Sequence, residues 1–204
     1  MAKEAPVVNA LARVLIAAMD ALKGADFALV GGIAISARTE PRFTRDLDLA
    51  LAAHDDAEAE TLVREMTAAG FQIGSIIEQD AAERLATVRL VGPGQTAHGV
   101  VVDLLFASSG IEPELVETAE LLEVFQGVTA PVAQIGHLIA LKLLARDDVH
   151  RPQDAVDLHA LVRAAGPADL AVARTSVELI ARRGFARGRD LMALLDGLTA
   201  SRPM

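Results

Sequence analysis

The sequence predicts a mixed α/β (α+β) fold, in which a central mixed sheet flanked by helices is followed by a helical C-terminal part. Four short segments alternate apolar and polar residues or form short apolar runs, as strands do: 46–51, 71–77, 84–91 and 99–106. Beyond about residue 112, apolar residues recur every three or four positions instead. Pro131 lies near this change. We therefore expect a sheet domain over residues 1–130 and a helical domain over residues 131–204 packed against it.

The individual elements follow from the same periodicities. Leu11, Leu15 and Met19 share one face of an amphipathic helix that ends near Gly24. The N-terminal half should contain a helix at 7–23, a strand at 27–30, a short helix after residues 31–32, a loop at 38–45 and a helix at 56–69. The C-terminal half should contain helices at 114–122, 134–146, 154–164, 168–182 and 188–198, with a brief extended piece at 128–132.

Composition excludes several classes of protein. With 52% hydrophobic and 23% charged residues, the 204-residue chain can bury a core and is not disordered on compositional grounds. There is no cysteine, which removes disulfides, thiolate metal sites and cysteine nucleophiles. A net charge of -9 disfavours a surface that binds nucleic acid as a whole, and local basic patches stay open. Charged residues interrupt the apolar N-terminal stretch, so we expect a cytoplasmic protein without export signal or membrane span.

The chemistry begins with a pair of carboxylates on one strand. In Asp46-Leu47-Asp48 the two-residue period of a strand places both acids on one face and Leu47 on the other. Two neighbouring carboxylates repel each other unless water, a basic group or a cation intervenes, and carboxylate oxygens suit Mg²⁺ or Mn²⁺. A solvated strand edge is the more common explanation of such a pair, so the pair alone is a weak signal.

A third acid interrupts an apolar run. Asp103 follows Val100, Val101 and Val102 in what should be a buried strand, where a carboxylate needs a cation, a basic partner or a wet edge. If this strand neighbours the strand at 46–51, the three aspartates converge. Such a set suits phosphoryl transfer with two metal ions.

Two glycines precede the paired acids. Val30 runs into Gly31 and Gly32, and a helix beginning there would present bare backbone amides to phosphate oxygens. A tight strand-to-helix turn that merely needs glycine is the alternative explanation. The thirteen intervening positions, 33 to 45, then lead to Asp46 and Asp48.

This order of parts resembles the DNA polymerase beta-type nucleotidyltransferase superfamily, and within it the AbiEii-type toxins. The resemblance implies the nucleotidyltransferase-type sheet, with glycines at the triphosphate, paired acids on the next strand and a third acid from a later strand. It assigns Asp46, Asp48 and Asp103 to catalysis and to the metal. The nucleotide would be bound by Gly31, Gly32, Ser36, Thr44, Arg45, Asp154 and Asp157. Gly32 stands where many members have serine, which removes one hydroxyl from the phosphate site.

A second segment resembles the same toxins. Lys142 lies in an otherwise apolar helix, and Arg151-Pro152-Gln153-Asp154 leads on to Asp157-Leu158. A lysine in a buried helix needs an anion, and Pro152 suits the first turn of a helix that carries both aspartates on one side. The anion could be Asp154, Asp157 or a nucleotide triphosphate. The resemblance favours the nucleotide and adds Lys142 to the catalytic residues.

The sequence thus predicts a magnesium-dependent enzyme (Mn²⁺ being the alternative) that passes a nucleotide from an NTP to a hydroxyl of RNA, tRNA or protein. The resemblance also implies a possible antitoxin partner. Two alternatives remain, a catalytically silent nucleotide-binding module and an enzyme that modifies a small molecule such as an antibiotic. Four arginines form the densest basic run, for which we expect mainly solvation rather than contact with an RNA backbone: Arg182, Arg183, Arg187 and Arg189.

Overall fold

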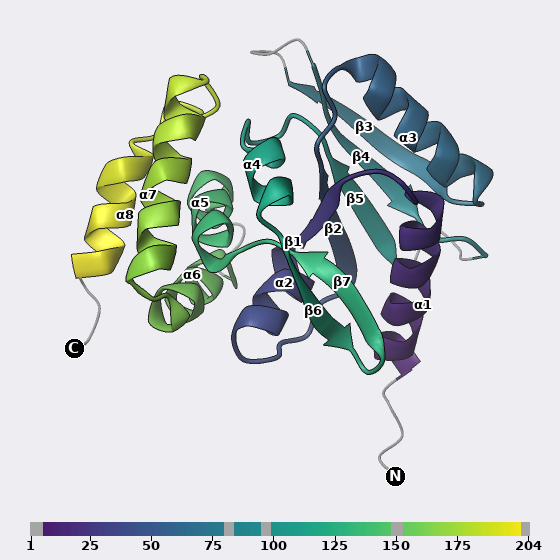
Figure 1. The fold of residues 1–204 in the computed structure, drawn as a ribbon, viewed down its shortest axis with the longest axis horizontal. Coiled ribbons are helices and arrows are strands. Elements are labelled where there is room, and N and C mark those ends of the chain that lie inside the picture. The colour runs from purple at the N-terminus through teal and green to yellow at the C-terminus, as the bar shows by residue number, and fades with distance from the viewer. Residues whose placement is uncertain (1–5, 80–83, 95–98, 148–152, 201–204) are drawn as a thin grey trace.

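A computed structural model describes residues 6–79, 84–94, 99–147 and 153–200. The strands are β1 (Phe27–Val30), β2 (Asp46–Leu51), β3 (Gln72–Gln79), β4 (Arg84–Val91), β5 (Val101–Leu105), β6 (Glu120–Phe125) and β7 (Val128–Val132). The helices are α1 (Pro6–Ala21), α2 (Gly31–Arg38), α3 (Asp56–Ala68), α4 (Glu112–Glu117), α5 (Ile135–Ala145), α6 (Gln153–Ala164), α7 (Pro167–Arg182) and α8 (Leu191–Ala200). The mixed α/β class expected from the sequence is confirmed (Figure 1).

Within the described ranges the strands form one mixed sheet in the order β3-β4-β5-β2-β1-β7-β6. Strand β2 runs parallel to β5, and Asp48 is the register partner of Asp103. Strand β1 is antiparallel to β2 and parallel to β7, where Leu29 pairs with Val132. The centre of the sheet therefore joins segments that are far apart in the sequence.

The alternation in β2 produces one apolar and one polar face. Leu47, Leu49 and Leu51 are fully buried, whereas Asp46 is exposed and Asp48 is partly exposed. Helices α1 and α3 pack against each other, α1 against β2 and α3 against β4. Figure 1 shows this pair on the opposite side of the molecule from helices α5 to α8. The period of two along β2 thus places its leucines in the core and its aspartates on the polar face of the sheet.

The C-terminal helices form a cluster around α5, which is apolar on all sides and packs against α6, α7 and α8. Helix α2 contacts α5 and α6 and so joins the cluster to the sheet. Arg38 at the end of α2 donates to the carbonyl oxygens of Val132 and Ala133 and pairs with Glu120. Across the described residues, no helix has both the length and the apolar character needed to cross a bilayer.

The expected helix over residues 114–122 is wrong in its second half. Helix α4 ends at Glu117, and β6 begins at Glu120 and pairs antiparallel with β7. The segment is rich in Leu and Glu, which favour helices in isolation, but pairing in the sheet overrides that weak preference. As a result the sheet extends to Val132, and the domain boundary expected after residue 130 falls inside β7.

Candidate active site

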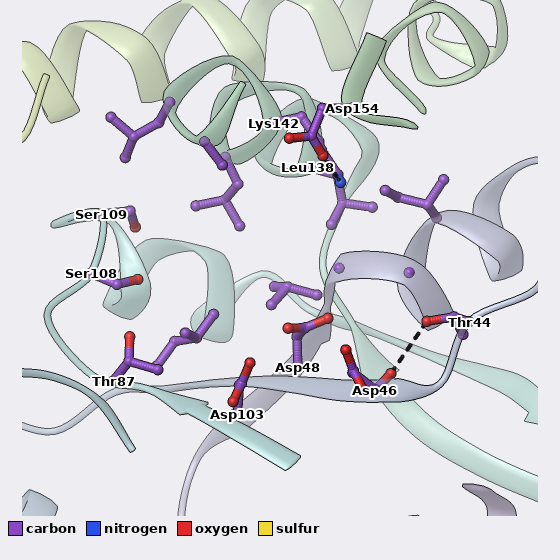
Figure 2. Close-up of a pocket in the computed structure, with 18 of the residues that line it drawn as sticks. Thr44, Asp46, Asp48, Thr87, Asp103, Ser108, Ser109, Leu138, Lys142 and Asp154 are labelled. Atoms are coloured by element: carbon purple, nitrogen blue, oxygen red, sulfur yellow. Dashed lines mark hydrogen bonds and ion pairs between the residues drawn. The ribbon is translucent and has the colours of Figure 1, made fainter. Parts of the chain in front are cut away.

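A cavity of about 720 Å³ lies between the polar face of the sheet and the C-terminal helices. Its volume is in the range of small-molecule sites. The wall from the sheet includes Asp46, Asp48 and Asp103, and the wall from α5 includes Lys142. In Figure 2 the three aspartates rise from neighbouring strands into this space, with Lys142 and Asp154 across it. The chain thus brings the three predicted acids to one cavity.

Adjacent parallel strands account for the meeting of the acids. The register of β2 and β5 places Asp48 directly beside Asp103, and Asp46 follows on the same face of β2. Asp103 is 8% exposed, so it is neither sealed under aliphatic side chains nor turned to the other side of the sheet. The sequence alone could place Asp46 and Asp48 on one face, but only strand order brings Asp103 to them.

The two glycines allow these side chains to approach the backbone. Gly31 has φ of +62°, a left-handed conformation that favours glycine, and a Cβ there would lie 1.8 Å from Oδ2 of Asp48. A Cβ on Gly32 would lie 2.6 Å from Oγ1 of Thr44. Gly31 is therefore favoured by its backbone conformation, and a side chain at Gly32 would require Thr44 to shift. The start of α2 lies against the acids as a consequence.

The carboxylates carry an excess of negative charge. Burial, then the charges of Asp103 and Asp46, raise the pKa of Asp48 to about 6, against the opposing effects of Lys142 and of a hydrogen bond from the Gly32 backbone. Within the described chain, neither Asp46 nor Asp48 forms an ion pair. Each therefore retains oxygen atoms that could bind a cation.

Asp103 differs because Arg89 holds both of its oxygen atoms. Nε of Arg89 donates to Oδ1 at 2.9 Å and Nη2 donates to Oδ2 at 2.7 Å, a bidentate arrangement. These hydrogen bonds and the charge of Asp103 raise the pKa of Arg89. The side chain of Arg89 is 52% exposed, so the guanidinium can move into solvent.

The donor set fits a hard divalent cation. Asp46 and Asp48 supply carboxylate oxygens without a basic partner, which is the chemistry that Mg²⁺ and Mn²⁺ prefer. No group of three or more acidic or histidine side chains in the described part of the chain is arranged as a complete metal site. Asp103 does not complete such a site here, because Arg89 already binds both of its oxygen atoms.

The side chain of Lys142 forms ion pairs with two carboxylates. Its Nζ lies 2.7 Å from Oδ1 of Asp154 and 2.9 Å from Oδ2 of Asp157, and all three side chains are largely buried. Nε of Arg42 lies 2.8 Å from Oδ1 of Asp157, and Gln153 donates to the same carboxylate. Burial raises the pKa of Asp157, but the hydrogen bonds and charges of Lys142, Gln153 and Arg42 outweigh it and leave the pKa below its ordinary value.

The remaining predicted residues are divided between the cavity and its surroundings. Thr44 and Asp154 line the cavity together with Gly31 and Gly32. Three others do not line it: Ser36, Arg45 and Asp157. Ser36 exchanges hydrogen bonds with the backbone of Arg42, and Arg45 stacks over the ring of Phe43 at 5.4 Å. Arg151 and Pro152 lie outside the described residues.

Three arginines that were not predicted as site residues also line the cavity: Arg42, Arg89 and Arg187. Arg89 could have been suspected, because Thr87 and Arg89 alternate on one face of β4. The basic run is exposed, as expected, and three of its members also bind to other parts of the protein. Arg183 pairs with Glu114 at 2.5 Å, Arg189 donates to the carbonyl oxygens of Leu143 and Leu144, and Arg187 donates to that of Ser108.

Two solved structures share the fold of this chain. The solved structure of an antigenic nucleotidyltransferase-like protein from Paracoccidioides brasiliensis matches with a TM-score of 0.52 and 19% identity, over 93% of this chain and 92% of that chain. ANT(2'')-Ia in complex with adenylyl-2''-tobramycin matches with a TM-score of 0.50 and 17% identity, over 86% and 95%. At such low identity these two structures show a shared fold.

No curated protein matches the chain. The family described as "Nucleotidyl transferase AbiEii toxin, Type IV TA system" matches residues 13–202, which is nearly the whole length. The resemblance based on the glycines, the paired acids and the lysine segment is confirmed at the level of the family. The chain belongs to the AbiEii nucleotidyltransferase toxin family.

Proposed function

We propose that this nucleotidyltransferase moves a nucleoside monophosphate from an NTP to an acceptor hydroxyl in a magnesium-dependent reaction. One observation carries the proposal. Asp46, Asp48 and Asp103 line one cavity beside Gly31 and Gly32, and the first two have no basic partner in the described chain. An enzyme that binds a polyphosphate through a divalent cation needs this arrangement of carboxylates.

Each residue has a separate task in this reaction. Asp46 and Asp48 would hold Mg²⁺, with Asp103 joining them when Arg89 releases an oxygen atom. When bound, the metal neutralises phosphate charge and favours the loss of pyrophosphate. Gly32 and Thr44 would border the triphosphate. Lys142 would face the phosphates from α5, and its amine is held by Asp154 and Asp157.

The proposed transfer is a single displacement at the α-phosphorus of the NTP. The acceptor oxygen forms a bond to the α-phosphorus, and the bond from that phosphorus to the bridging oxygen of the β-phosphate breaks. Pyrophosphate leaves with the electron pair of that bond. The proton of the acceptor hydroxyl passes to Asp103 and on to solvent. The walls of the cavity align the two reactants, which lowers the entropic cost of the step.

We propose RNA, tRNA or protein as the acceptor, the cytoplasm as the location and an antitoxin as the partner. The family's description as the toxin of a type IV toxin–antitoxin system supports an antitoxin as the partner. The antibiotic-modifying alternative rests on the shared fold with ANT(2'')-Ia. Competition between acceptors in one assay separates the two.

The test incubates the purified protein with each α-labelled NTP, Mg²⁺ and, in turn, total RNA, a protein extract and aminoglycosides. We expect label on RNA or protein, lost with a chelator and in Asp46→Asn. Asp20→Asn, on the exposed surface of α1, removes the same charge and should keep activity. Label that persists in Asp46→Asn would refute the assignment of the acids. Nucleotide binding without any labelled product would favour the catalytically silent module.

A further inference from the structure

The segment between α7 and α8 places one arginine at the rim of the cavity. Arg187 lines the cavity and donates from Nη2 to the carbonyl oxygen of Ser108 at 3.0 Å. In Figure 2 Ser108 and Ser109 lie on the far side of Asp103 and Asp48 from Thr44. Since Gly32 lies against Thr44, Arg187 is at the end of the cavity opposite the glycines.

Arg187 differs from the other cations of the cavity in its partners. Arg42, Arg89 and Lys142 each form ion pairs with aspartates. Arg187 forms none within the described residues. The nearby Glu112 is buried, and its Oε1 already accepts hydrogen bonds from the amides and hydroxyls of Ser108 and Ser109. The guanidinium thus has donors left for an incoming anion.

The electrostatic surroundings of Arg187 agree with an unmatched positive charge. Desolvation and then the charge of Arg189 lower its pKa, and the carboxylate of Glu112 offsets this only in part. An anion placed beside the guanidinium would offset both effects, because an opposite charge stabilises the protonated form.

The backbone of Arg187 is held in an unfavourable conformation. Its φ of 53° is the left-handed region, and it is the one non-glycine residue of the described chain with a positive φ. Side chains with a Cβ adopt this region at a cost, and the cost persists only where the surroundings impose it. Here both flanks are fixed, because Arg183 binds Glu114 and Arg189 binds the carbonyl oxygens that end α5. Such outliers are concentrated at ligand-binding sites.

We propose that Arg187 forms a phosphate-binding subsite at the end of the cavity opposite Gly31 and Gly32. The inference rests on the proposed function, in which the glycine end holds the triphosphate. The phosphate at Arg187 can belong to the acceptor, as a phosphodiester of RNA, or to the nucleotide. Its position across the acids favours the acceptor, whose hydroxyl must approach from the side away from the leaving pyrophosphate.

The test compares Arg187→Gln with Arg64→Gln, which removes the same charge from the exposed face of α3. Calorimetry measures the affinity for ATP with Mg²⁺, and fluorescence anisotropy measures that for a short single-stranded RNA over a range of salt. Loss of one charged contact should weaken the RNA complex by about tenfold. The slope of log K against log salt should fall by roughly 0.7. Affinity for ATP should stay unchanged.

Each outcome has a definite meaning. Weaker binding of ATP with unchanged binding of RNA would keep the subsite and assign it to the nucleotide. Unchanged binding of both, or an equal loss in Arg64→Gln, would overturn it. Because binding is measured without turnover, a wild-type protein that transfers no label but binds RNA through Arg187 would refute the reaction and not the subsite.

A second variant separates binding from folding. Arg187→Gly removes the guanidinium and also suits the left-handed backbone. We expect it to bind RNA as weakly as Arg187→Gln while its melting temperature is equal to or above that of the wild type. A melting temperature well below the wild type would show that Arg187 serves mainly to hold Ser108, and would contradict a binding role.

Discussion

The two walls of the cavity handle charge in opposite ways. On the sheet, three carboxylates face a single arginine, so negative charge is left over around Asp48. Across the cavity, Asp154 and Asp157 are paired with basic side chains of the described residues, Lys142 and Arg42, so neither carboxylate is left uncompensated. A balanced buried cluster is complete without a ligand, whereas an unbalanced one awaits a cation. In the proposed reaction, the sheet would therefore bind the metal ion, and the helical wall would position Lys142.

The largest expected effect breaks the helical cluster. Lys142→Met leaves two buried carboxylates without their shared cation, and we expect a loss of about 3 kcal/mol in the free energy of unfolding, measured by urea denaturation. Adding Asp154→Asn to Lys142→Met should recover part of this loss. A stability equal to the wild type in the single variant would show that the cluster is not balanced as described.

The same substitution should act with opposite sign on the two walls. Asp157→Asn removes a paired charge and should destabilise by about 2 kcal/mol. Asp48→Asn removes a repelled charge and should stabilise the metal-free protein by on the order of 1 kcal/mol, allowing for its contact with solvent. Urea denaturation in chelator measures both. Destabilisation by both variants would remove the contrast between the walls.

Replacing Arg89 should increase the difference in charge between the two walls of the cavity. Arg89→Gln frees both oxygens of Asp103 and removes a positive charge that competes with a metal ion. We expect Mn²⁺ to bind about tenfold more tightly in the absence of nucleotide, as measured by electron paramagnetic resonance. The partly exposed pair of Arg84 with Asp56 provides a control, since Arg84→Gln should leave Mn²⁺ affinity unchanged. Weaker binding of Mn²⁺ in Arg89→Gln would contradict a competing role.

The smallest effect is on acid stability. The folded-state pKa of Asp157 lies below its ordinary value of 3.8. Its contribution to stability is therefore present above that value and is lost as the pH falls through the folded-state pKa. Between about pH 5 and about pH 2, the stability of Asp157→Asn should decline less steeply than that of the wild type. Parallel declines in urea midpoints would show that Asp157 does not gain from the cluster.

Local patterns predicted much of the sheet wall. Alternation placed Asp46 and Asp48 on the polar face of β2, and the apolar run identified the strand of Asp103. The glycines were predicted at the start of α2, where the structure has them. Strand order could not be predicted, because no local property of the sequence indicates that β5 lies beside β2. For the same reason the partner of Asp103 on β4 went unnoticed.

The errors arise where tertiary contacts decide. The residues of β6 favour a helix alone and become a strand only because β7 is available to pair with them. The choice of anion for Lys142 depended on how α6 docks beside α5, which periodicity does not give. Arg187 looked like an ordinary surface arginine, since a left-handed φ at a non-glycine residue leaves no trace in the sequence.

The parallel pairing of β1 with β7 has a consequence for the order in which the protein matures. Strand β1 completes its ladder only when Val132 is available, and Arg38 anchors the glycine-bearing helix to Val132 and Ala133. A nascent chain emerging from the ribosome lacks these contacts until about two thirds of it has been synthesised. The end of the cavity that carries the glycines is therefore completed only after β7 has been synthesised.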